Sequence, residues 1–85
     1  METKSIPKKK RFSVLGGGEI QAENADEIVE ALRALAFAKY RTADDYMYAT
    51  AEHCKTQTGA KVDIFNSETF VRDLIRHGFL APVEP

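Results

Sequence analysis

Apolar residues spaced three and four positions apart in residues 25–36 are the feature that most limits how this chain can fold. This spacing places them on one face of an α-helix, which needs a second apolar layer to cover it. Asn24 precedes the run as a helix N-cap, and Asp26 and Glu27 favour the positive end of the helix dipole. The sequence therefore predicts an amphipathic helix that begins after Asn24. Its buried face would hold Ala25, Ile28, Val29, Leu32, Leu35 and Ala36.

Two short alternating runs precede this helix, at residues 12–15 and 19–22, with three glycines between them at 16–18. Glycine adopts positive φ angles without steric cost, so the pattern predicts a β-hairpin. One face of the hairpin would turn inward and carry Phe12, Val14, Ile20 and Ala22.

A second helix is predicted from Thr42, its N-cap, to about Gln57, with Gly59 as the stop signal. The competing interpretation is one continuous helix that runs through Thr42, because neither glycine nor proline marks a break there. The inward face of the second helix would be made of small and medium side chains, namely Ala43, Met47, Thr50, Ala51 and Cys54.

Residues 61–65 alternate and include β-branched side chains, so they predict a third strand. A third helix would follow the cap at Asn66 or Ser67 and end before Gly78. The predicted order is β-β-α-α-β-α. It describes a small α+β domain in which the hairpin and the third strand form a three-stranded antiparallel sheet packed against helices.

Eighty-five residues are enough for one domain. We expect a flexible basic arm over residues 1–11, the folded domain over 12–80 and a tail over 81–85. Five basic side chains against one glutamate give the arm a charge of +4, and because the whole chain carries −1, the remainder carries −5.

Within the arm, residues 7–11 resemble the short basic type of nuclear-localisation signal. Lys8, Lys9, Lys10 and Arg11 are the candidate contacts to nucleic acid. Such contacts would be independent of base sequence and sensitive to salt. The acidic remainder opposes this use, so a nucleic-acid-associated accessory factor is the alternative hypothesis.

Few residues are suited to catalysis or to metal binding. A single cysteine excludes an intramolecular disulfide framework. His53 and Cys54 are neighbours and would point about 100° apart on a helix, so they form neither a zinc pair nor a nucleophile–base pair. The sequence predicts no catalytic residue, no cofactor and no metal site, and we do not expect an enzyme.

The leading hypothesis is a small intracellular protein that acts by contact with a protein partner or with itself. A domain this small has little stability to spare, which favours self-association. No run of residues is long and apolar enough to cross a membrane, so we expect a cytoplasmic protein, or a nuclear one in a eukaryote. The candidate interface residues surround the junction of the first two helices and are Phe37, Tyr40, Tyr46 and Tyr48.

Overall fold

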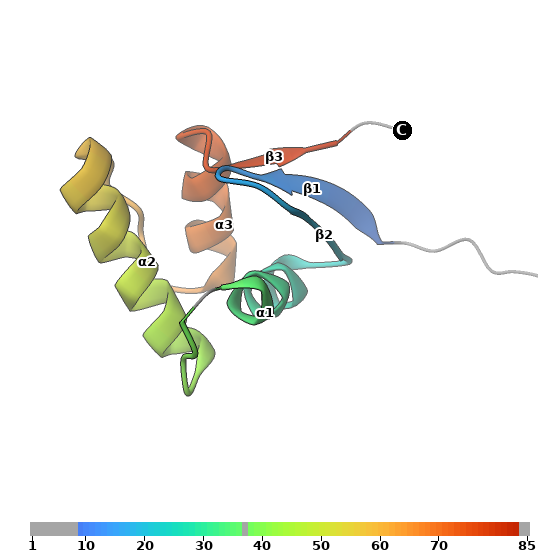
Figure 1. The fold of residues 1–85 in the computed structure, drawn as a ribbon, viewed down its shortest axis with the longest axis horizontal. Coiled ribbons are helices and arrows are strands. Elements are labelled where there is room, and N and C mark those ends of the chain that lie inside the picture. The colour runs from blue at the N-terminus through green and yellow to red at the C-terminus, as the bar shows by residue number, and fades with distance from the viewer. Residues whose placement is uncertain (1–8, 37, 84–85) are drawn as a thin grey trace, which may run out of the picture.

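A computed structural model of the chain describes residues 9–36 and 38–83. Within them are three helices and a three-stranded antiparallel sheet whose strand order is β2-β1-β3 (Figure 1). This confirms the predicted α+β class and the antiparallel sheet. The elements are β1 (Lys10–Val14), β2 (Glu19–Ala22), α1 (Ala25–Leu35), α2 (Ala43–Thr58), α3 (Ser67–Arg76) and β3 (Leu80–Pro82). Helices α1 and α3 lie next to the sheet, and α2 packs against α1.

The hairpin of β1 and β2 forms as predicted. Phe12 pairs with Ile20, and both side chains are buried on the face that meets the helices. The loop is closed by a hydrogen bond from the Val14 N–H to the Gly18 carbonyl oxygen at 3.0 Å. Its three glycines have φ angles of 97°, 120° and 97°, which other residues rarely adopt.

Helix α1 begins after Asn24, whose side-chain oxygen accepts a hydrogen bond from the Glu27 N–H at 2.9 Å. Ile28, Val29 and Leu32 are buried as expected. Leu35 is not: it is the last residue of the helix, its side chain lies beside Gly18 of the hairpin loop, and 47% of its surface is exposed.

Helices α1 and α2 are separate, so the continuous-helix interpretation is wrong. Ala36 leaves the helical conformation with a ψ of 142°. The Arg33 guanidinium donates to the carbonyl oxygen of Tyr40 at 2.7 Å and thereby ties Tyr40 to α1. Thr42 then caps α2 by accepting from the Asp45 N–H at 3.0 Å, and Gly59 ends α2 in the left-handed conformation.

The third strand was predicted in the wrong place. Residues 61–65 form no strand, and β3 instead follows α3, which reverses the predicted order of the last helix and the last strand. Two hydrogen bonds close the end of α3, from Gly78 N–H to Ile75 oxygen at 3.1 Å and from Phe79 N–H to Leu74 oxygen at 2.9 Å. This glycine turn directs the chain back along the free edge of β1.

The strand β3 includes Ala81 and Pro82, which correct the predicted tail over 81–85. Ser13 pairs with Ala81, and the Val83 N–H donates to the Arg11 carbonyl oxygen at 2.9 Å. Because paired residues alternate along an antiparallel ladder, Pro82 lies at a position whose N–H would point away from β1. A proline there closes the outer edge of the sheet to further strands without losing a hydrogen bond.

Residues 61–65 are held by Asp73 of α3 instead of by a neighbouring strand. The Asp73 carboxylate accepts a hydrogen bond from the Asp63 N–H at 2.9 Å. That hydrogen bond, followed by the contacts with Arg72 at 3.3 Å and Arg76 at 3.7 Å, keeps the pKa of this buried carboxyl below its ordinary value although burial opposes it.

One core lies between the sheet and the helices. Val29, Phe70 and Leu80 come from α1, α3 and β3 and are its most completely buried large side chains. The other buried apolar residues are Phe12, Ile20, Ala22, Ile28, Leu32, Tyr46, Met47, Cys54, Val71 and Leu74.

Truncation of Leu32 to alanine is expected to lower the free energy of unfolding by about 2 to 5 kcal/mol, because it removes a buried side chain and leaves a cavity. Leu32 is only 4% exposed, in the centre of the inward face of α1. Chemical denaturation followed by circular dichroism measures the change. A loss below about 1 kcal/mol would contradict the central position of α1 in the core.

Acid is expected to destabilise the fold through Asp73. Because its folded pKa is lowered, its contribution is present above the unfolded pKa of about 4 and is lost as the pH falls through the folded value. Asp73→Asn keeps an oxygen for the Asp63 N–H but does not titrate. We therefore expect the melting temperature of the variant to fall less than that of the wild type between pH 6 and pH 3. Parallel curves would contradict this assignment.

Candidate functional site

The predicted basic cluster lies at the start of β1, and part of it belongs to the sheet. Lys8 is outside the described residues. Lys9 directly precedes β1, while Lys10 and Arg11 are strand residues that pair with Ala22 and Gln21. The predicted arm over residues 1–11 therefore extended too far, because the ladder with β2 continues to Lys10 and holds that backbone in place.

These basic residues border a groove where the sheet extends beyond α3 (Figure 1). The cavity measures about 640 Å³. Its floor is apolar and comes from segments far apart in the sequence, because Ile75 of α3, Pro82 of β3 and Val83 all line it. We call it the basic groove, and it is lined by Lys9, Lys10, Arg11, Phe12, Ile75, Pro82 and Val83.

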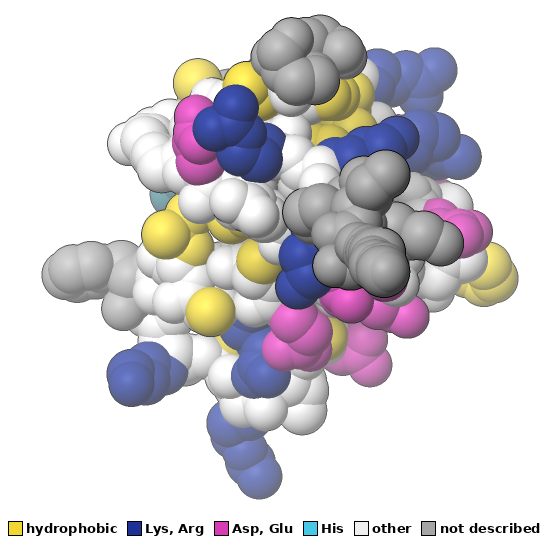
Figure 2. Space-filling model, turned by 90° about the vertical axis from the view of Figure 1, so that its right-hand side faces the viewer, with side chains coloured by type: hydrophobic (Ala, Val, Ile, Leu, Met, Phe, Trp, Pro, Cys, Tyr) yellow, Lys and Arg dark blue, Asp and Glu magenta, His cyan; other side chains and the backbone are white. Residues whose placement is uncertain are grey.

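The charges around the basic groove are mixed. Figure 2 looks onto this end of the molecule and shows Lys and Arg side chains around hydrophobic ones in its upper part, with Asp and Glu side chains gathered below. Lys9 lies 4.0 Å from Glu27 and Arg11 lies 3.8 Å from Glu19. Exposed pairs of this kind contribute about 0 to 1 kcal/mol, so the two acids hold these cations only weakly.

The predicted aromatic interface is not one surface. Phe37 lies outside the described residues. Tyr46 is buried, and its ring makes edge-to-face contacts with Tyr40 at 5.5 Å and with Phe70 at 6.1 Å. Burial raises the pKa of Tyr46. Tyr48 points the other way on α2 and is 60% exposed. Tyr40 and Tyr46 therefore pack at the edge of the core, and of the three described tyrosines only Tyr48 is largely exposed.

A second cavity, which sequence reasoning missed, lies between α2 and the hairpin loop. Helix α2 diverges from the sheet towards its C-terminal end (Figure 1), and the space between them measures about 390 Å³. Leu32, Leu74 and Leu80 form its apolar floor, and Leu15 of the hairpin loop stands at its side. We call it the α2–hairpin cleft.

One wall of this cleft belongs to α2 and carries Cys54 and His53, the neighbours that the sequence excluded as a zinc pair and as a nucleophile–base pair. Cys54 is buried there, and burial raises the pKa of its thiol, which disfavours the reactive thiolate. His53 is exposed on the same wall, beside Thr50 and Gln57. His77 lies elsewhere, at the C-cap of α3 near the ring of Phe79.

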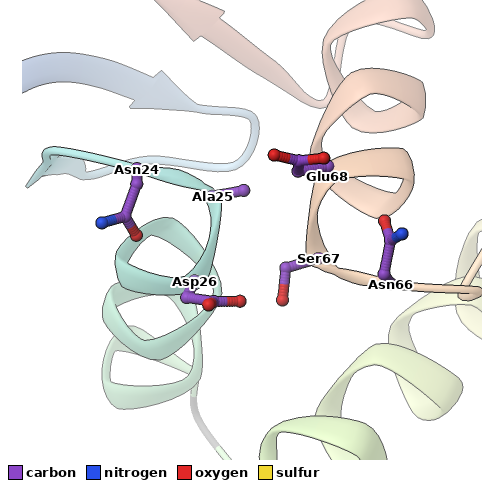
Figure 3. A pocket seen from close by; sticks show the side chains of 6 residues that line it. All are labelled: Asn24, Ala25, Asp26, Asn66, Ser67 and Glu68. Carbon is purple, nitrogen blue, oxygen red and sulfur yellow. The ribbon is translucent and has the colours of Figure 1, made fainter.

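A shallow hollow separates the N-termini of α1 and α3 (Figure 3). Asp26 and Glu68 project into it, while Asn24 and Asn66 are engaged as caps of their own helices. The two carboxylates would repel an anion. Among the described residues, no group of three or more His, Cys, Asp or Glu side chains is placed to hold a metal ion.

In residues 9–36 and 38–83, no helix has both the length and the hydropathy needed to span a membrane. Comparison of the chain with protein-family models, with curated proteins and with solved structures gives no match. The function must therefore be argued from the cavities and charges themselves.

Proposed function

We propose that this chain is a small non-catalytic binding module that recognises a short acidic segment of another protein through the basic groove. The observation that carries the proposal is that basic residues and an apolar floor line one cavity, with Lys10 on the same face of β1 as Phe12. Backbone pairing positions two of those residues, Lys10 and Arg11, before any partner arrives.

The two kinds of lining would contribute differently. The cations attract a negatively charged segment and orient it, which raises the association rate more than the affinity. The apolar floor supplies the affinity by burying side chains of the partner. Ile75 is 37% exposed in the groove, so it has surface left to bury.

A protein segment fits this groove better than a nucleic acid does. Glu19 and Glu27 stand within 4.0 Å of the basic side chains and would repel a long phosphate backbone. Phe12, the one aromatic ring among the described residues of the lining, is only 7% exposed and offers no face on which a base could stack. Nucleic-acid association through Lys9, Lys10 and Arg11 remains the second candidate, supported by the run of basic residues.

The test uses a labelled peptide of alternating Glu and Leu residues and follows its fluorescence anisotropy. We expect the double variant Lys9→Glu, Lys10→Glu to weaken binding by about 10-fold or more, because both charges beside the floor are reversed. The matched control is Lys39→Glu, Lys61→Glu, which changes the net charge equally at exposed positions outside the groove. It is expected to change the affinity less than about 3-fold.

Two outcomes would contradict the proposed function. Equal losses in the two double variants would mean that overall charge, and not the groove, attracts the peptide. Tighter binding of a duplex DNA than of the peptide at about 0.15 M salt, lost in Lys9→Glu, Lys10→Glu, would establish the second candidate instead.

A further inference from the structure

The α2–hairpin cleft is chemically unlike the basic groove. Its described lining includes no Lys, Arg, Asp or Glu side chain. An occupant would therefore bury no charge of the protein and would meet Leu32, Leu74 and Leu80 on the floor. The occupant that fits this lining is uncharged and apolar.

The same surface carries a projecting apolar side chain. Leu15, at the start of the hairpin loop, is 66% exposed. No atom outside the loop lies within 4 Å of the place where a Cβ would stand on Gly16 or Gly17. The loop is therefore a thin tip that is open around Gly16 and Gly17, with one aliphatic side chain beside the cleft.

We propose that the occupant of the cleft is the hairpin tip of a second copy of this chain, with Leu15 of each copy inserted against the cleft of the other. A two-fold dimer uses the same patch on both copies, so a projection and its receiving cavity must lie side by side on one surface. Leu15 is itself part of the cleft lining, which meets this requirement.

Hydrogen bonds within the chain also fix the conformation of the hairpin tip. Hydrogen bonds from Val14 N–H to Gly18 oxygen and from Gly17 N–H to Val14 oxygen, each 3.0 Å long, fix the loop before contact. Leu15 N–H donates to the Phe79 carbonyl oxygen at 2.9 Å and anchors the tip to the segment that precedes β3. A segment fixed in this way loses little conformational freedom on association.

Sedimentation equilibrium of the full chain tests the proposal. We expect a dimer whose dissociation constant rises by about 30-fold or more in Leu15→Asp, as for an interface hot spot. His53→Glu places a charge on the opposite wall of the cleft at an exposed position, so it should weaken the dimer without unfolding the chain. Circular dichroism checks the fold of each variant.

Phe65→Asp is the matched control. Phe65 is 82% exposed and lies outside the cleft. The substitution Phe65→Asp therefore removes more exposed apolar surface than Leu15→Asp does, and it should leave the dimer unchanged. Lys9→Glu, Lys10→Glu should also leave it unchanged, because the basic groove is a separate surface. Failure of peptide binding and failure of dimerisation are thus observed in different variants.

A cross-linking experiment identifies the contact in the folded dimer. A chain with Leu15→Cys and Cys54→Ser is mixed with the wild-type chain, whose cysteine lies in the cleft. Mild oxidation should give a disulfide-linked pair of the two chains, and Phe65→Cys, Cys54→Ser should give none. A wild-type chain that stays monomeric at about 1 mM would overturn the proposal, as would a dimer unaffected by Leu15→Asp.

Discussion

The burial of one face of α1 between the hairpin and α3 is the contact on which the rest of the structure depends. Val29 is completely buried there, and Ile28 and Leu32 lie on the same face. Helix α1 packs against β2, α2 and α3, so the sheet and the other helices are joined through it. Since a chain of 85 residues buries a smaller fraction of its surface than a larger domain does, little else can replace this contact.

Both candidate binding surfaces are consequences of this arrangement. The sheet extends past α3 at the end where β1 begins, which leaves Ile75, Pro82 and Val83 open beside the basic residues. At the opposite end of β1, α2 diverges from the hairpin loop and leaves the uncharged cleft (Figure 1). The chain therefore presents a charged surface and an apolar one at the two ends of one strand, and these are the surfaces that we propose for two different partners.

Sequence reasoning succeeded where neighbouring residues determine the structure. The caps at Asn24 and Thr42 and the glycine turn of the hairpin act over a few residues, and all of them form as predicted. The prediction of the third strand was wrong because alternation cannot show which segment pairs with β1. The hydrogen bond that holds residues 61–65 instead joins Asp63 to Asp73, ten residues away, and no local pattern marks it. The basic residues were identified from the sequence, but the groove floor and the cleft join distant segments, and no local pattern marks them.

The central claim is that the two ends of β1 bind different partners. Amide chemical shifts of the isotope-labelled chain test it most directly, first on dilution and then on addition of the acidic Glu–Leu peptide. The account predicts that dilution shifts Leu15, His53 and Gln57 around the cleft, and that the peptide shifts Lys10, Ile75 and Val83 around the groove. One common set of shifted residues, or shifts scattered over the whole chain, would contradict it.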